Sequence, residues 1–291
     1  MDTRKKLVLV IVISVVVVGS FVLIPSFFGG YDDSDYTTII NPEPIDFVKI
    51  SVLVEDTANG TLSTAAGLSI FVETENLAIL FDAGPSDSVL RDNSVSLGID
   101  LEASCDFVVL SHEHGDHAVG LSYISDIHDN LTLYTRDVVP PSSGTFTQQS
   151  WWNDFTKIRV GDTFELATGI ALIPMGFEHA LVLYVKNLGL VVLVGCSHPG
   201  VDNLVARAID TFGVDDVYMV MGGFHIGEGF ASQDQRSAAI DALIDIDVQY
   251  ICALHCAGDA TRNYVQSNYP DHYVEARVGY QIVLNETAIG P

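Results

Sequence analysis

The chain has 291 residues and a formal net charge of −25 at pH 7, because 38 acidic side chains outnumber 13 basic ones. A surface this acidic repels nucleic acids and anionic lipid headgroups, so it excludes a nucleic-acid-binding function and is typical of a solvated exterior. The 48% hydrophobic composition suffices for one large core. We therefore expect one folded domain rather than several.

An apolar run follows the first six residues. Residues 7–28 are apolar apart from a few small polar side chains and, at about 1.5 Å per residue, would span about 33 Å as a helix, enough to cross a bilayer. Basic residues precede the run and acidic ones follow it, namely Arg4, Lys5 and Lys6 before it and Asp32, Asp33 and Asp35 after it. This asymmetry predicts a membrane anchor with a cytoplasmic N-terminus and an extracytoplasmic domain. A cleaved signal peptide is the alternative, and it also exports the domain.

Residues 29–46 contain a glycine pair, an acidic cluster and two prolines, a composition typical of a linker. We therefore divide the chain into a membrane anchor at residues 1–28, a linker at residues 29–46 and a folded domain at residues 47–291.

The folded domain begins with hairpin-rich strands and ends with strands that alternate with helices. Apolar patterning predicts strands at residues 48–54, 68–73, 77–81, 107–110, 131–134, 157–160, 170–173, 180–185, 190–194, 217–221, 250–254 and 278–284. Helices are predicted at residues 86–97, 201–212 and 235–244. This order is typical of an α+β fold with two mixed sheets and helices outside them.

Residues 140–155 interrupt this pattern with two prolines and the pair Trp151-Trp152. A long irregular segment in a compact domain is either a functional lid or a packed loop, and the sequence leaves both open.

The four cysteines, Cys105, Cys196, Cys252 and Cys256, form no C-x-x-C pair. Cys252 and Cys256 could form a disulfide, and the spacing does not decide their redox state.

The apolar strand at residues 107–110 leads directly into His112-Glu113-His114-Gly115-Asp116-His117. So many potential ligands in one short segment are too dense for core packing. Imidazole and carboxylate groups bind zinc at about 2.0 to 2.2 Å, so one turn of this kind can serve two adjacent ions. The segment therefore predicts a metal site at the carboxyl end of a buried strand.

This His-x-His-x-Asp-His motif resembles the signature of the metallo-β-lactamase superfamily, whose fold is an αββα sandwich. The resemblance implies that His112 and His114 bind one metal ion, and that Asp116 and His117 bind a second. Oxygen-reducing di-iron relatives carry glutamate where this chain has His114, so the resemblance favours zinc, as one or two ions. Asp82, in the motif Leu80-Phe81-Asp82-Ala83-Gly84, is expected to brace the metal loop rather than bind metal.

Three later motifs each end an apolar strand: Gly195-Cys196-Ser197-His198-Pro199-Gly200, Gly222-Gly223-Phe224-His225 and His255-Cys256-Ala257-Gly258. Together they resemble the branch of the superfamily that includes dihydropterin-ribofuranosylaminobenzene 5′-phosphate synthase.

The resemblance implies roles for the histidines of these motifs. His255 is expected as a ligand of the second metal. Most of the superfamily has a bridging aspartate where this chain has Cys196. We expect His198 to replace that aspartate as a metal ligand, with a thiolate from Cys196 as the alternative. His225 is expected to contact the substrate or donate a proton, and His179 is a weaker candidate for the third ligand of the first metal.

These residues predict a metal-dependent hydrolase. A zinc-class ion lowers the pKa of water from 15.7 toward about 7, and the resulting hydroxide would attack a small ester, lactone, thioester or phosphoester. Asp116 would hold the second metal and orient this nucleophile. Two alternatives stay open. One is a synthase-like enzyme of methanopterin biosynthesis, which export of the domain disfavours, and the other is a non-catalytic metal-binding sensor.

Overall fold

The computed structural model describes residues 42–138 and 145–285. The predicted membrane segment and most of the predicted linker lie outside these residues. Within the described part, no helix combines the length and apolarity needed to cross a membrane. The last predicted linker residues are described, and Ile45 forms a bridge with Val185 and packs against the core.

Two mixed β-sheets form the centre of the domain. The seven-stranded sheet has the order β13-β1-β2-β3-β4-β5-β6. Its strands are β1 (Phe47–Val54), β2 (Ser69–Thr74), β3 (Ala78–Phe81), β4 (Phe107–Val109), β5 (Thr132–Arg136), β6 (Thr156–Val160) and β13 (Gln281–Asn285). The six-stranded sheet has the order β12-β11-β10-β9-β8-β7. Its strands are β7 (Phe164–Ala167), β8 (Ile170–Met175), β9 (Glu178–Val185), β10 (Gly189–Val194), β11 (Val217–Gly223) and β12 (Tyr250–Leu254).

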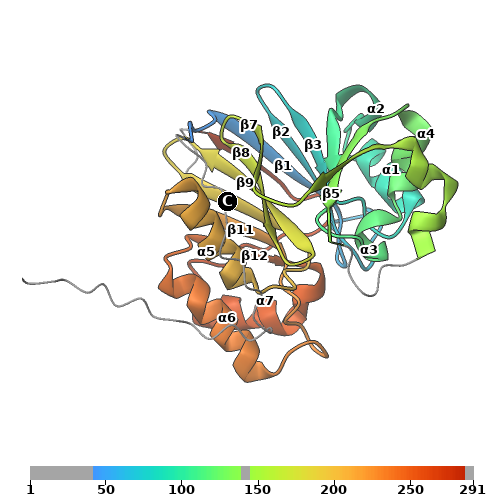
Figure 1. The fold of residues 1–291 in the computed structure, drawn as a ribbon. Coiled ribbons are helices and arrows are strands. Elements are labelled where there is room, and N and C mark those ends of the chain that lie inside the picture. Colours follow the sequence, from blue (N-terminus) through green and yellow to red (C-terminus); the bar gives the residue numbers. More distant parts are fainter. Residues whose placement is uncertain (1–41, 139–144, 286–291) are drawn as a thin grey trace, which may run out of the picture.

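Helices cover the outer face of each sheet (Figure 1). Those over the seven-stranded sheet are α1 (Asp87–Ser96), α2 (Leu101–Ser104), α3 (Gly115–Ala118) and α4 (Leu121–Ile127). Those over the six-stranded sheet are α5 (Val201–Phe212), α6 (Gln233–Asp245) and α7 (Gly258–Asn268). The predicted α+β fold, with two mixed sheets flanked by helices, is confirmed.

The sequence of β10 shows why the layers pack in this order. All six residues of this strand are buried, as expected for a strand covered on both faces. Successive side chains point to opposite faces, so Val191 and Leu193 join the core between the sheets, whereas Val192 and Val194 pack beneath the helices.

The segment with two tryptophans is a packed loop where the structure describes it. It contains the short helix η2 (Ser150–Asp154), which packs on α4. The side chain of Trp152 is only 5% exposed and lies in the core beneath the first sheet's helices. The packed-loop alternative therefore holds for the tryptophans, and residues 139–144 lie outside the described part.

Candidate metal centre

Strand ends bring the predicted ligands to one edge of the sandwich. The segment from His112 to His117 follows β4, and the segment from Cys196 to His198 follows β10. His225 follows β11 and His255 follows β12. Strands β10, β11 and β12 are adjacent and parallel, so their carboxyl ends meet at the same edge.

Three histidines form the first group of donors. His112, His114 and His198 each offer a ring nitrogen, and these atoms lie within 4.8 Å of one another. The Nε2 atom of His112 is 2.9 Å from Nδ1 of His114. His198 was expected to replace the bridging aspartate, but the structure places it here, in the position for which His179 was the candidate.

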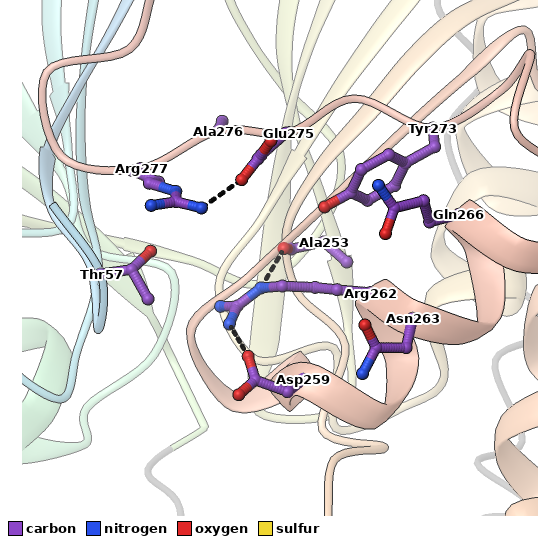
Figure 2. Close-up of a pocket in the computed structure, with 10 residues that line it drawn as sticks. All are labelled: Thr57, Ala253, Asp259, Arg262, Asn263, Gln266, Tyr273, Glu275, Ala276 and Arg277. Carbon is purple, nitrogen blue, oxygen red and sulfur yellow. Dashed lines mark hydrogen bonds and ion pairs between the residues drawn. The ribbon is translucent and has the colours of Figure 1, made fainter. Parts of the chain in front are cut away.

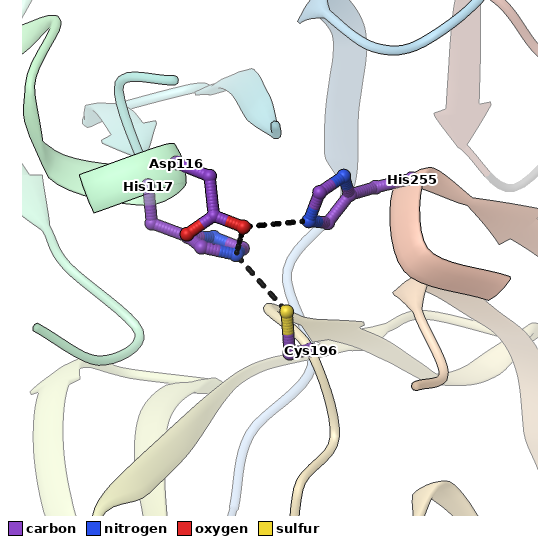
Figure 3. Close-up of side chains that lie close together, drawn as sticks. All are labelled: Asp116, His117, Cys196 and His255. Carbon is purple, nitrogen blue, oxygen red and sulfur yellow. Dashed lines mark hydrogen bonds and ion pairs between the residues drawn. The ribbon is translucent and has the colours of Figure 1, made fainter. Parts of the chain in front are cut away.

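The second group combines four donors of three chemical types. Asp116, His117, Cys196 and His255 point toward one another, as Figure 3 shows, with their donor atoms within 4.8 Å. The Nε2 atom of His117 is 3.1 Å from Sγ of Cys196, and Nε2 of His255 is 3.2 Å from Oδ2 of Asp116. Cys196, in the loop that follows β10, therefore lies on the His117 side of this group.

Oxygen partners hold the outer nitrogen of four histidines, so that Nε2 faces inward. Nδ1 of His117 bonds Asp82 at 2.6 Å, and Nδ1 of His198 bonds Glu178 at 2.9 Å. The other two pairs are His112 with Ser111 at 2.9 Å and His255 with Asp56 at 3.4 Å. Metal-binding histidines almost always have such an outer partner, which fixes the tautomer and the ring orientation.

Asp82 braces the loop that follows β4, which carries His112 to His117. Its carboxylate is fully buried and accepts hydrogen bonds from the backbone N–H and the hydroxyl of Ser111, at 2.7 and 2.8 Å, in addition to the bond from His117. Asp82 lies outside both donor groups. The geometry matches the bracing role expected for it.

Glu178 supports the second loop, and the sequence analysis missed it. The Glu178 carboxylate accepts the backbone N–H groups of Cys196, Ser197 and His198 at 2.8 to 3.0 Å. Burial acts to raise the pKa of Glu178, but the bonds from His198 and the backbone outweigh it and lower the pKa to about 2. A Cβ on Gly195 would lie 2.1 Å from Oγ of Ser111, so only glycine fits before this loop. The one sequence signal was that Glu178 precedes His179.

Left-handed backbone recurs at the residues that shape the site. The φ angle is +57° at Asp82, +59° at Ser197, +50° at His225 and +46° at His255. Such conformations cost about 1 to 3 kcal/mol each in residues other than glycine, and they cluster at functional sites. The strand ends therefore turn sharply enough to aim these side chains at one place.

A third group places His225 beside two thiols. Cys196, His225 and Cys256 also have donor atoms within 4.8 Å of one another, and the two Sγ atoms are 3.4 Å apart. The Nδ1 atom of His225 is buried and has no hydrogen-bond partner among the described residues. All four cysteines are free, so the possible bond between Cys252 and Cys256 does not form.

Histidines of the first and second donor groups differ in their pKa values. Burial, with the neighbouring histidines, lowers the pKa of His112 and of His114, so both rings are neutral and able to bind metal. Burial also acts to lower the pKa of His255, but its bonds to Asp116 and Asp56 raise that pKa to about 10. His112 and His114 can therefore bind a cation without losing protons, whereas His255 must lose one.

Glu113 and His179 lie outside the donor groups. Glu113 is buried and pairs with Arg159, in agreement with its being out of register in the motif. His179 is fully buried, and neither ring nitrogen has a hydrogen-bond partner among the described residues. Burial, followed by the charge of Arg136, lowers the pKa of His179 to about 3.

A polar pocket of about 260 Å³ is lined by residues of helix α7, such as Arg262, and of the segment that follows it, such as Arg277 (Figure 2). Arg262 links the pocket to the site, because it pairs with Glu55, which accepts the backbone N–H of His255 at 2.9 Å. Arg262 also pairs with Asp259, and Arg277 pairs with Glu275. Since both arginines are neutralised by carboxylates, we do not assign an anionic ligand to this pocket.

Comparison with known proteins agrees with this geometry. A sequence model of the metallo-beta-lactamase superfamily matches residues 64–237, and the chain belongs to this superfamily. It is 25% identical to the 7,8-dihydropterin-6-methyl-4-(beta-D-ribofuranosyl)-aminobenzene-5'-phosphate synthase of Methanocaldococcus jannaschii, over 83% of this chain and 98% of that protein. The predicted resemblance to the superfamily and to the synthase branch is therefore confirmed.

Solved structures share the fold. Tm1679, a metal-dependent hydrolase of the beta-lactamase superfamily, has a TM-score of 0.69 and 24% identity, covering 82% of this chain and 100% of its own. YhfI from Bacillus subtilis has a TM-score of 0.59 and 14% identity, covering 82% of this chain and 100% of its own.

Replacing Glu178 should weaken metal binding. The substitution Glu178→Gln keeps the shape of the side chain but replaces one acceptor oxygen with an N–H₂ group, so His198 or a backbone N–H loses its partner. Loss of an outer partner costs about 10- to 100-fold in metal affinity, which a competition titration against a chelator would measure. The matched control is Glu113→Gln, another buried carboxylate of the region, which pairs with Arg159. Unchanged affinity in Glu178→Gln would contradict the bracing role.

Replacing His179 should make the free energy of unfolding less sensitive to acid, without loss of bound metal. Because the folded pKa of about 3 lies below the usual 6.5, only the unfolded chain gains this proton as the pH falls below 6.5, and stability falls with it. Between pH 7 and pH 5 this loss is about 2 kcal/mol, and His179→Leu should remove it. Urea denaturation of the metal-free protein at both pH values would measure the difference. An unchanged pH dependence, or loss of bound metal in the variant, would contradict this reading of His179.

Proposed function

We propose that this protein is a membrane-anchored, metal-dependent hydrolase acting on a small ester, lactone, thioester or phosphoester. One observation supports this proposal above all. Two groups of donors converge at one edge of the sandwich. In each histidine whose Nε2 faces inward, an oxygen partner holds the other ring nitrogen, Nδ1.

The donor set fits divalent ions of the zinc class. Three imidazoles in the first group match a catalytic zinc site, which leaves one position for water or substrate. Imidazole, carboxylate and thiolate in the second group match a four-coordinate zinc site. We assign His112, His114 and His198 to one ion, and Asp116, His117, His255 and Cys196 to a second.

When bound, such ions supply a water of lowered pKa and polarise a carbonyl or phosphoryl oxygen. The protein's own residues would do the rest. Asp116 is partly exposed, and its Oδ2 accepts a hydrogen bond from His255, which supports a role for this carboxylate in orienting the attacking water. Among the described residues the buried Nδ1 of His225 has no hydrogen-bond partner, and its ring lies against that of His198; both observations support a role for His225 in contacting the substrate or protonating the leaving group.

Removing Asp116 should abolish hydrolysis. Because Asp116 would serve both as a ligand and in positioning the nucleophile, Asp116→Ala should lower kcat by more than the about 100-fold that outer partners contribute. Turnover of a panel of phosphodiester, lactone and thioester substrates by the full-length protein would measure this. The control is Asp259→Ala, a carboxylate outside the donor groups whose side chain is 80% exposed. Undiminished turnover in Asp116→Ala would show that the site is misassigned.

The second candidate is a synthase of methanopterin biosynthesis. The synthase of Methanocaldococcus jannaschii, matched over 98% of its length, favours it. We retain the hydrolase because the predicted anchor would place the domain outside the cytoplasm, away from the expected substrates of such a synthase. The non-catalytic sensor is disfavoured because loss of metal ligands would mark it, whereas the described residues still bring potential donors together in groups.

The side of the membrane on which the domain lies discriminates the two enzymes. Since basic residues precede the apolar run, the domain should be digested by protease added outside intact cells, whereas a cytoplasmic reporter protein should survive. Protection of the domain until the cells are lysed would favour the synthase. A metal content below about one zinc-class ion per chain, with no turnover of any substrate, would contradict the metal-dependent enzyme.

A further inference from the structure

Two phenylalanines flank the donor groups from different loops. Phe177 lies in the hairpin between β8 and β9, and Phe230 lies between β11 and α6. Phe177 is half-buried, whereas 54% of Phe230 is exposed. Exposed apolar side chains are ordinary when scattered singly, so exposure alone assigns no role to Phe230.

The position of these rings beside the donors is the informative feature. The ring centroid of Phe177 lies 4.9 Å from that of His198, and the ring of His198 lies 4.5 Å from that of His225. The ring of His225 lies 4.2 Å from that of Phe230, with 34° between the planes. Four rings therefore form a continuous row along the site. Among the exposed large apolar residues of the described chain, Phe230 is the one whose ring stacks on a histidine of the donor groups.

Buried arginines hold both loops in place. Arg136 is 5% exposed and donates from Nη2 and Nε to the carbonyl of Gly176, at 2.6 and 3.2 Å. Arg236 is 8% exposed and donates from Nε to the carbonyl of Ile226 at 2.8 Å. The N–H of Gly227 also bonds the carbonyl of Cys256 at 3.2 Å. The two phenylalanines are therefore carried by loops whose backbone is anchored next to them.

We propose that Phe177 and Phe230 are the walls of a substrate site for a planar aromatic ring joined to the scissile group. Rings prefer to stack at centroid separations of 4.5 to 7 Å, and such pairs stabilise a complex beyond the burial of area alone. Anchored walls add affinity because little conformational freedom is lost on binding. The proposal rests on the proposed function, since it places the scissile group at the donor residues.

Two phosphonates test the site without requiring turnover. Phenylphosphonate and methylphosphonate share the anionic group that a metal centre would hold, and they differ in the ring. Isothermal titration of the full-length, zinc-loaded protein should show phenylphosphonate binding about tenfold more tightly than methylphosphonate. In Phe230→Leu and Phe177→Leu the preference should fall to about threefold or less, because leucine keeps apolar bulk but loses the ring.

The matched control is Phe164→Leu. Phe164 is also exposed, at 37%, and it stacks on Tyr134 from the opposite edge strand β7. This variant should keep the wild-type preference, and metal analysis of every variant checks that the donor groups stay intact. Equal affinity of the wild type for both phosphonates, or an unchanged preference in Phe177→Leu and Phe230→Leu, would overturn the aromatic site. An intact preference with no hydrolysis of any substrate would overturn the proposed function and leave the aromatic site standing.

Discussion

The whole site depends on two buried carboxylates, Asp82 and Glu178, each of which holds one loop of the donor groups. Burying a carboxylate costs several kcal/mol unless hydrogen bonds and a partner charge offset the loss of water. At Asp82 the loss of water prevails, and its pKa is raised. At Glu178 three backbone N–H groups and His198 more than offset burial, so this carboxylate stays ionised. Without Asp82 the ring of His117 would lose the partner that orients it, and without Glu178 the ring of His198 would lose its partner.

These carboxylates come from different sheets, which ties the site to the packing of the sandwich. Asp82 follows β3 of the seven-stranded sheet, and Glu178 begins β9 of the six-stranded sheet. Each of the first two donor groups likewise combines a histidine following β4 with one following β10 or β12. A shift of one sheet against the other would separate the donors. The dry core between the sheets, which includes Val109, Leu193 and Leu254, therefore stabilises the spacing of the site as well as the fold.

The sequence predicted the parts of the site that are dense in one short segment, and it failed where tertiary contacts decide. The cluster from His112 to His117 was evident because no core packing explains so many donors together. Glu178 was missed because a single glutamate at the start of an apolar strand has no local pattern. The sequence did not reveal that His198 lies beside His112 and His114, because a left-handed turn at Ser197 directs the chain just before it. Helix α7 was not predicted, since only Thr261 and Val265 are buried and no apolar period marks it.

The donor groups do not by themselves distinguish a hydrolase from a synthase, because the same ligands can polarise a substrate in either reaction. Function in a shared fold depends on the site built upon it. Selection must therefore come from the residues around the donors. The loops of Phe177 and Phe230 are the parts that combine proximity to the donors with apolar surface. Since Arg136 and Arg236 hold the backbone of these loops, little conformational freedom would be lost when a substrate binds there, and the proposed aromatic site would select substrates at the donor groups without rearranging the loops.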